Sequence, residues 1–356
     1  MIRHRLLPLG ALLIVLALGA AACSTSSEFD DPNDPLASEQ YAIDQMNLQG
    51  AWERSDGEDV VIAIIDTGID LDHPDLKDNI VPGWDWVDDD DTPNDENGHG
   101  THVAGSAAAI GNNSIGVIGM APRAKIMPLK VLGADGSGNS EDIAEAILWA
   151  VDNGADVINL SLGGSSDLVG RIYNKVDPTN AAIAEADRRG VVVVAAAGND
   201  DTFLTAYNPE TPVIVVNASN EIGETARFSN FGDPRAVSAP GTRIMSTAPT
   251  YRTTIWPKGS NGYEELDGTS MASPQVAGIV ALMVGRGQSP SEIRDALIQT
   301  AINPAGDPLL GAGIVQADAA VKESTRLVSP LAFALVLLIV GGLAVAVVAW
   351  ERRRNA

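Results

Sequence analysis

Five short apolar runs constrain the fold of this chain more than any other feature of its sequence. Each run is rich in β-branched residues and lacks polar alternation, which is the pattern of a strand buried on both faces of a sheet. Strands of that kind occur in parallel sheets that helices cover on both sides. The runs are Val60–Asp66, Ala124–Leu132, Asp156–Leu162, Val191–Ala197 and Val213–Ala218.

Helical patterns lie between and after these runs, at His99–Ile110, Ser140–Asn153, Thr179–Arg189, Thr269–Arg286 and Pro290–Thr300. This alternation predicts an α/β fold of three layers, with a mostly parallel central sheet and helices on both faces. Ligands of such sheets bind at the carboxyl ends of the strands. Asp66, Ser161 and Asn199 all fall at such ends.

The composition narrows the range of partners. The formal net charge is −24 over 356 residues, a field that repels nucleic acid and suits cations. Aromatic residues make up only 4% of the chain, so Val, Ile, Leu and Ala must build the core. The single cysteine, Cys23, excludes an intramolecular disulfide.

The N-terminal residues 1–23 are predicted to be an export signal, because a basic start is followed by the apolar stretch Leu6–Ala22. The site at Ala20–Cys23 fits either ordinary cleavage or a lipoprotein in which Cys23 carries the lipid. Residues 24–33 are rich in Ser, Thr and acidic side chains, and we expect them to be a short tether.

The C-terminal end carries a second candidate membrane segment. Leu331–Trp350 is apolar, uncharged and long enough to span a bilayer. Arginines in the tail 351–356 predict that this end stays in the cytoplasm. The main domain, residues 34–322, would then lie outside the cell membrane on a single-pass anchor. A cleavable sorting tail would have the same pattern.

Two positions could supply catalytic groups at the sheet edge. Gly268 and Thr269 place Ser270 at the start of an apolar helix, where its hydroxyl is exposed and the helix dipole favours negative charge. The same residues could form an ordinary N-cap. Asn199 follows a buried strand, and is either a turn former or a donor to an oxyanion.

A base and an orienting carboxylate lie upstream of Ser270. Asp66 ends a buried strand, where a carboxylate is costly unless it is partnered. His99 has glycines on both sides at a helix start, and is therefore the candidate general base. His73, in a loop before a proline, and His102, one turn into the helix, are expected to have structural roles.

Together these segments resemble the subtilisin family of serine proteases, and within it the thermitase-type enzymes. The resemblance covers residues 34–322, with every motif in the family's order. Signatures of competing hydrolases, G-x-S-x-G and H-E-x-x-H, are absent from the sequence. The motifs are Asp66-Thr67-Gly68, Asn97-Gly98-His99-Gly100-Thr101-His102, Ser161-Leu162-Gly163-Gly164, Ala197-Gly198-Asn199 and Gly268-Thr269-Ser270-Met271-Ala272.

The resemblance implies a role for each matching residue. Ser270 would be the nucleophile, His99 the general base and acid, Asp66 the orienting carboxylate, and Asn199 an oxyanion donor. Residues near two strand ends would bind the peptide substrate by β-augmentation and line a pocket with few side-chain atoms, which favours an apolar or broad preference. These are Ser161, Leu162, Gly163, Gly164, Ala195, Ala196, Ala197 and Gly198.

A dense acidic run precedes His99 and predicts a calcium site. Packed carboxylates repel one another unless a hard cation neutralises them, and Ca²⁺ prefers oxygen ligands. Pro93 stands where an EF-hand needs glycine, and a solvated acidic loop is the alternative. The candidate ligands are Asp85, Asp88, Asp90, Thr92 and Asn94.

The resemblance also implies a second calcium site that would tie the N-terminal segment to a loop. Its ligands would be the side chains of Asp34, Asp75 and Asn113 and the carbonyls of Ile110, Ile115 and Val117. Binding there would stabilise the fold by mass action.

Three features depart from the usual family pattern. Only 43 positions separate Cys23 from Asp66, which leaves little room for a folding prodomain. Gln275 stands where relatives usually have histidine, and Tyr251–Leu266 is longer than in close relatives and could reshape the cleft rim. A membrane-tethered endopeptidase is the favoured interpretation. The alternatives are a dedicated maturation protease with few targets, like the anchored mycosins, and an inactive peptide-binding module.

Overall fold

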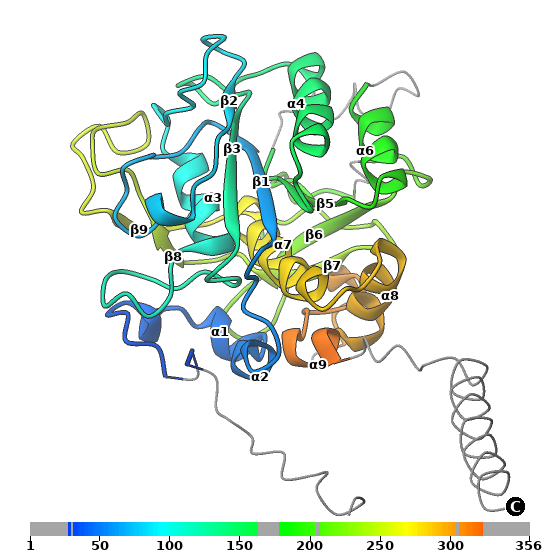
Figure 1. Ribbon diagram of the computed structural model, residues 1–356. Coiled ribbons are helices and arrows are strands. Elements are labelled where there is room, and N and C mark those ends of the chain that lie inside the picture. Colours follow the sequence, from blue (N-terminus) through cyan, green and yellow to red (C-terminus); the bar gives the residue numbers. More distant parts are fainter. Residues whose placement is uncertain (1–27, 30, 163–177, 204–206, 304–305, 323–356) are drawn as a thin grey trace, which may run out of the picture.

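The computed structural model describes residues 28–29, 31–162, 178–203, 207–303 and 306–322 (Figure 1). The predicted signal (1–23), membrane helix (331–350) and basic tail (351–356) lie outside the described residues, as does half of the tether, residues 24–27 and 30. Within the described ranges, none of the helices combines the length and the apolar character that crossing a bilayer requires.

A seven-stranded sheet forms the centre of the molecule, and every pairing in it is parallel. The five predicted strands are confirmed as β1, β3, β4, β5 and β6. The spatial order is β2-β3-β1-β4-β5-β6-β7, so the chain passes β3 on its way from β1 to β2 and passes β1 on its way from β3 to β4. The bounds are β1 Val61–Asp66, β2 Trp84–Asp85, β3 Lys125–Lys130, β4 Val157–Leu160, β5 Val192–Ala196, β6 Val213–Ser219 and β7 Val237–Pro240.

Helices cover both faces of this sheet, as predicted. Successive side chains of β1 point to opposite faces. Ile62 and Ile64 enter a core with α3 (His99–Ala108) and α7 (Thr269–Gly285). Ala63 and Ile65 enter a second core with α4 (Ser140–Asp152) and α6 (Pro178–Arg188).

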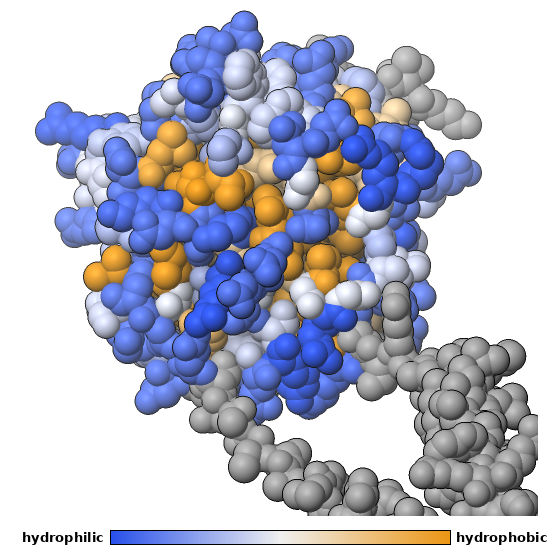
Figure 2. All heavy atoms as spheres, in the orientation of Figure 1, coloured by the Kyte–Doolittle hydropathy of each residue, from blue (hydrophilic) through white to orange (hydrophobic). Residues whose placement is uncertain are grey.

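Smaller elements complete the α3/α7 face. The helices α1 (Ala42–Gln45), α2 (Leu48–Trp52), α8 (Pro290–Thr300) and α9 (Ala317–Lys322) contribute to the same core. The hairpin of β8 (Ile244–Thr247) and β9 (Tyr263–Leu266) packs beside α3. Three short 3₁₀ turns lie at Ala37–Glu39, Lys77–Asn79 and Pro308–Leu310. Hydrophilic residues cover most of the face in Figure 2, and apolar residues gather near its middle.

Candidate active site

Three elements bring the predicted catalytic residues to one edge of the sheet. Asp66 is the last residue of β1, His99 is the first of α3, and Ser270 is the second of α7. Both helices pack on the same face of the sheet and against each other. The carboxyl end of a buried parallel strand thus faces two helix starts, the arrangement in which such sheets bind ligands.

Asp66 and His99 form a direct pair. His99 Nδ1 donates to Asp66 Oδ1 at 2.7 Å, and the backbone N–H of Thr67 donates to the same oxygen at 2.8 Å. The Asp66 carboxylate is fully buried, and its Oδ2 has no hydrogen-bond partner among the described residues. The His99 side chain is 22% exposed, so its far edge can reach solvent or a substrate. This bond leaves Nε2 free to accept a proton.

The charge of Asp66 also changes the basicity of His99. Burial alone would lower the pKa of the imidazole, because it disfavours the charged form. The Asp66 charge, its hydrogen bond and the charge of Asp95 outweigh burial and raise the pKa above the ordinary value for histidine. The imidazole is therefore a better proton acceptor than a free one.

Ser270 and Ser161 are bonded to each other reciprocally. The Ser270 hydroxyl donates to the Ser161 carbonyl at 3.2 Å, and the Ser161 hydroxyl donates to the Ser270 carbonyl at 2.8 Å. In the described part of the chain, the hydrogen bond of Ser270 Oγ thus goes to Ser161 and not to His99. Rotation about the Cα–Cβ bond of Ser270 is the movement that would turn its hydroxyl toward another acceptor.

A proline in α7 explains why the Ser270 carbonyl is available. Pro274 has no N–H to donate to the carbonyl four residues before it, and its ring crowds that carbonyl. The Ser161 hydroxyl supplies the missing donor. Asn159 extends this link, since its Nδ2 donates to Ser161 Oγ at 2.8 Å and its Oδ1 accepts from Ser273 Oγ at 2.7 Å. The end of β4 is therefore fastened to the first turn of α7.

The amide of Asn199 is oriented so that its NH₂ group can act as a donor. Its Oδ1 accepts from the Thr269 backbone N–H at 2.9 Å and from the Thr269 hydroxyl at 3.0 Å. A Cβ added to Gly268 would lie 3.6 Å from Asn199 Nδ2 and 3.5 Å from Ser270 N. The two donors predicted for an oxyanion hole therefore converge on a common region.

The described residues of the predicted substrate wall lie on the neighbouring strands β4 and β5. Ser161 is buried and Leu162 half-buried at the end of β4. Ala195 and Ala197 belong to the α4/α6 core, so the strand's backbone, and not these two methyl groups, is available to a ligand. Ala196 is also buried, and Gly198 is half-buried with a φ of +101°. Gly163 and Gly164 lie outside the described residues.

The other two histidines are structural, as expected. His73 Nε2 donates to the Gly262 carbonyl at 2.9 Å, and its Nδ1 accepts from the Asp75 N–H. His102 is fully buried, and its Nε2 donates to the carbonyls of Ile244 and Glu264. Burial lowers the pKa of His102 to about 3, so its ring is neutral at physiological pH.

The segment Tyr251–Leu266 lies against the loop that precedes His99. The Thr254 N–H donates to the Glu96 carbonyl, and the Ile255 N–H donates to the Asn97 carbonyl, each at 3.0 Å. This segment therefore forms one rim of the site.

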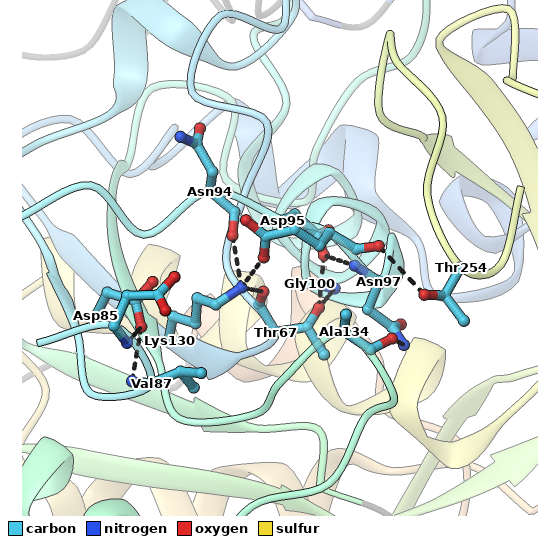
Figure 3. Close-up of polar contacts among 12 residues, drawn as sticks. Thr67, Asp85, Val87, Asn94, Asp95, Asn97, Gly100, Lys130, Ala134 and Thr254 are labelled. Carbon is cyan, nitrogen blue, oxygen red and sulfur yellow. Dashed lines mark hydrogen bonds and ion pairs between the residues drawn. The ribbon is translucent and has the colours of Figure 1, made fainter. Parts of the chain in front are cut away.

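The acidic loop is built by backbone pairing. Asp85 and Asp90 exchange backbone hydrogen bonds, at 2.9 and 3.2 Å, and Asp85 Oδ1 accepts the N–H groups of Val87 and Asp88 (Figure 3). Asp85 is buried and Asn94 half-buried, while Asp88, Asp90 and Thr92 are exposed. Across the described ranges, no three His, Cys, Asp or Glu side chains converge as a metal-binding group. The loop's carboxylates therefore do not converge on one point.

The residues of the second predicted calcium site, unlike those of the acidic loop, are connected to one another by hydrogen bonds. Asp34 accepts the N–H groups of Asn112 and Asn113, and Asp75 accepts the Asn113 side-chain amide at 2.6 Å and the Val117 N–H at 3.0 Å. Ile110 donates its N–H to the Asp75 carbonyl.

Two buried carboxylates thus share this second site, and Ile115 is joined to it through the Asn113 side chain. Burial, with the nearby charge of Asp34, raises the pKa of Asp75 to about 6 despite its hydrogen bonds. A hard cation would neutralise two buried carboxylates that lie this close to each other. The residues of the second site are therefore suited to calcium.

Sequence reasoning missed Asp95 and Lys130. Asp95 is fully buried four residues before His99, and Lys130 is buried at the end of β3, next to Asp66 in the sheet. The Lys130 ammonium donates to the carbonyls of Thr67 and Asn94 and pairs with Glu96 (Figure 3). The sequence signal that could have identified Lys130 is its place at the end of an apolar strand, as Asp66 is at the end of another, and the two residues pair in the sheet.

Comparison with known proteins agrees with this geometry. The model of the Subtilase family matches residues 57–327. Thermitase from Thermoactinomyces vulgaris is 42% identical over 272 residues, covering 76% of this chain and 91% of that protein. Subtilisin Savinase from Lederbergia lenta is 40% identical over 286 residues, covering 79% of this chain and 98% of that protein.

A solved structure of a protease from Pseudoalteromonas arctica superposes with a TM-score of 0.72 at 36% identity, covering 82% of this chain and 98% of that one. The family match contains the whole central sheet and the starts of α3 and α7. The chain belongs to the subtilase family and is a subtilisin-like serine endopeptidase.

Proposed function

We propose that the chain hydrolyses peptide bonds through an Asp66–His99–Ser270 triad and an acyl-enzyme intermediate. The observation that carries this proposal is the 2.7 Å bond between His99 Nδ1 and Asp66, at the sheet edge where α7 presents Ser270. His99 Nε2 takes the proton of Ser270 as Oγ attacks the scissile carbonyl. The same imidazolium then gives its proton to the leaving amine.

Asp66 holds the imidazole in the tautomer that leaves Nε2 as the acceptor, and its charge stabilises the imidazolium. Water hydrolyses the acyl-enzyme by the same steps, with His99 activating the water. Asn199 Nδ2 and the Ser270 N–H donate to the oxyanion of both tetrahedral intermediates. This role is supported by the orientation that Thr269 imposes on the Asn199 amide.

The substrate is an extended peptide that pairs with the backbone after β4. Ser161, Leu162 and Gly163 would pair with the peptide backbone, and Gly163, Gly164 and Ala195–Gly198 would line the primary pocket. Gly163, Gly164 and Ala195–Gly198 would contribute backbone and small side chains, and none of these residues carries a charge that would select for a charged side chain. We expect an apolar or broad preference.

Calcium has a structural part in this proposal. Asp34, Asp75, Asn113 and the carbonyls of Ile110, Ile115 and Val117 would hold one ion. A second ion at Asp85, Asp88, Asp90, Thr92 and Asn94 would require these side chains to turn toward a common point, because the loop's carboxylates do not converge in the described structure. When bound, the ion supplies positive charge that neutralises packed carboxylates. It thereby stabilises the folded state and takes no part in the proton transfers.

The peptidase domain is proposed to act outside the cell membrane. Residues 1–23 direct export, and Leu331–Trp350 anchors the chain, with the arginines of the tail on the cytoplasmic side. This part of the proposal depends on the sequence pattern alone.

A serine-directed organophosphate probe separates the protease from an inactive binding module. The full-length chain should be labelled and should cleave a denatured protein substrate, while Ser270→Ala should do neither. Absence of label on the parent chain, or equal label on Ser270→Ala, would remove the proposed chemistry.

A further inference from the structure

A second buried carboxylate lies directly behind the loop that carries His99. Asp95 has 0% exposure, four residues before the imidazole, and has no part in the chemistry described above. It belongs to the polar network in Figure 3, which also contains Thr67, Asn97 and Gly100.

Asp95 accepts five hydrogen bonds, one from Thr67 and four from residues 97–101 at the start of α3. Its Oδ1 accepts the Thr67 hydroxyl at 2.8 Å and the N–H groups of Asn97 and Gly98 at 3.1 and 2.7 Å. Its Oδ2 accepts the N–H and the hydroxyl of Thr101 at 2.9 and 2.6 Å. Residues on both sides of His99 are therefore held by one carboxylate, which fixes where the helix begins.

Thr67 joins this carboxylate to Asp66. Its N–H donates to Asp66 Oδ1, its hydroxyl donates to Asp95 Oδ1, and the same hydroxyl accepts the Gly100 N–H at 2.9 Å. The strand end that carries Asp66 and the helix start that carries His99 thus share one threonine.

Two carboxylates act on the imidazole, and the other titratable groups of the neighbouring elements are paired or neutral. Asp66 faces it from β1 and Asp95 from the preceding loop. Lys130, from β3, is paired with Glu96, and His102, one turn later in α3, is neutral. Burial lowers the pKa of His99, and both aspartates raise it. Asp95 therefore adds negative charge behind the base without touching it.

We propose that Asp95 is a positioning residue of the active site, which acts through Thr67 and the first turn of α3 to hold the His99 imidazole against Asp66. The proposal rests on the triad proposed above. It goes further by assigning a buried fourth polar group that neither touches substrate nor transfers a proton.

The charge of Asp95 is tested without any catalytic assay. The titration of the His99 ring is followed by NMR in the full-length chain carrying Ser270→Ala, with and without Asp95→Asn. The midpoint should fall by roughly 0.5 to 1 pH unit in Asp95→Asn, as expected when a nearby opposite charge is removed. An unchanged midpoint in the folded variant would overturn the proposal.

Asp233→Asn is the matched control, because Asp233 is also a buried aspartate with donors of its own, in the loop before β7. Its removal should leave the His99 midpoint where it is in Ser270→Ala. An equal fall in both variants would mean that general loosening of the fold moves the midpoint, and would also overturn the proposal.

Thr67 provides a second test if Asp95→Asn does not fold. Thr67→Val removes the hydroxyl link but keeps both carboxylates, and should lower kcat roughly tenfold to a hundredfold with little change in KM. Thr67→Ser should restore most of kcat. Parent-like kcat in Thr67→Val would contradict the proposal. If the parent chain itself hydrolyses no peptide, the proposed function fails, while the ring titration still reports on Asp95.

Discussion

At the scale of single residues, the arrangement around Ser270 depends on where polar atoms find partners. Asp66 and His99 could be predicted because a carboxylate at the end of a buried strand needs a partner, and few histidines are available. Asp95 could not, because it follows a run of acidic residues in which local spacing does not separate a buried carboxylate from a solvated one. Thr67 and Thr101 come to surround Asp95 only in the folded structure, where both donate hydrogen bonds to it.

The oxyanion role of Asn199 gives a prediction at this scale. Asn199→Ala removes one donor to the developing negative charge and should lower kcat by about 10²–10³-fold, the loss already known for this donor in the family, with little change in KM. Steady-state kinetics on a peptide anilide measure both constants. A rise in KM at unchanged kcat would show that the amide binds the ground state instead.

At the scale of elements, continuous apolar runs predicted the five inner strands of the central sheet correctly. The strands β2 and β7 were missed because Trp84–Asp85 is too short for a pattern and Val237–Pro240 lacks a long apolar run. The β8–β9 hairpin was missed for another reason, since the long connection 248–262 separates its two strands and its register depends on packing against α3.

The junction of β4 with α7 gives a prediction at this scale. Ser161→Ala removes the hydrogen-bond donor of the carbonyl of residue 270. Pro274 cannot replace this donor, because it has no N–H. The free energy of unfolding should fall by about 1–3 kcal/mol, the cost of an unsatisfied buried polar group. Denaturant titration in the Ser270→Ala background, which prevents self-digestion, measures it.

Ser161→Thr keeps the hydroxyl and serves as the matched control for this junction. It should retain more of the parent stability than Ser161→Ala does. Equal stability with and without Ser161→Ala in this background would mean that the bond from the Ser161 hydroxyl to the carbonyl of residue 270 contributes nothing to the fold.

At the scale of the whole molecule, stability without disulfides depends on the two cores, on buried polar groups and, by our proposal, on calcium. His102 illustrates the cost of one buried group. Its pKa is about 3 in the folded state, against about 6.5 in an unfolded chain, so between about pH 6.5 and pH 3 mainly the unfolded state binds the proton.

The free energy of unfolding should therefore fall as the pH drops from about 6.5 to about 3, by up to about 1.4 kcal/mol per pH unit from this residue. Urea titrations between pH 4 and 8 should show a shallower dependence in His102→Gln than in the parent, both in the Ser270→Ala background. Identical slopes would contradict the assignment of a neutral, buried ring.

Removal of calcium tests its proposed contribution to the stability of the folded state. A ligand that binds only the folded state stabilises it by about 2.7 kcal/mol at a hundred times its Kd, so chelation should lower Tm. In Asp75→Asn the chelator should have a smaller effect, because one site has lost a buried carboxylate.

Asp72→Asn, which changes a nearby exposed aspartate, should respond to the chelator as the parent does. A Tm that is unchanged on chelation of the parent would count against both calcium sites.

The most direct test of the account measures whether Asp66, His99 and Ser270 work as one unit. The kcat of Ser270→Ala is compared with that of the double variant His99→Ala/Ser270→Ala and of the variant in which all three residues are replaced. Residues that serve a single proton transfer give strongly non-additive losses, so the double and triple variants should be about as slow as Ser270→Ala alone. Losses that multiply from one variant to the next would contradict the account.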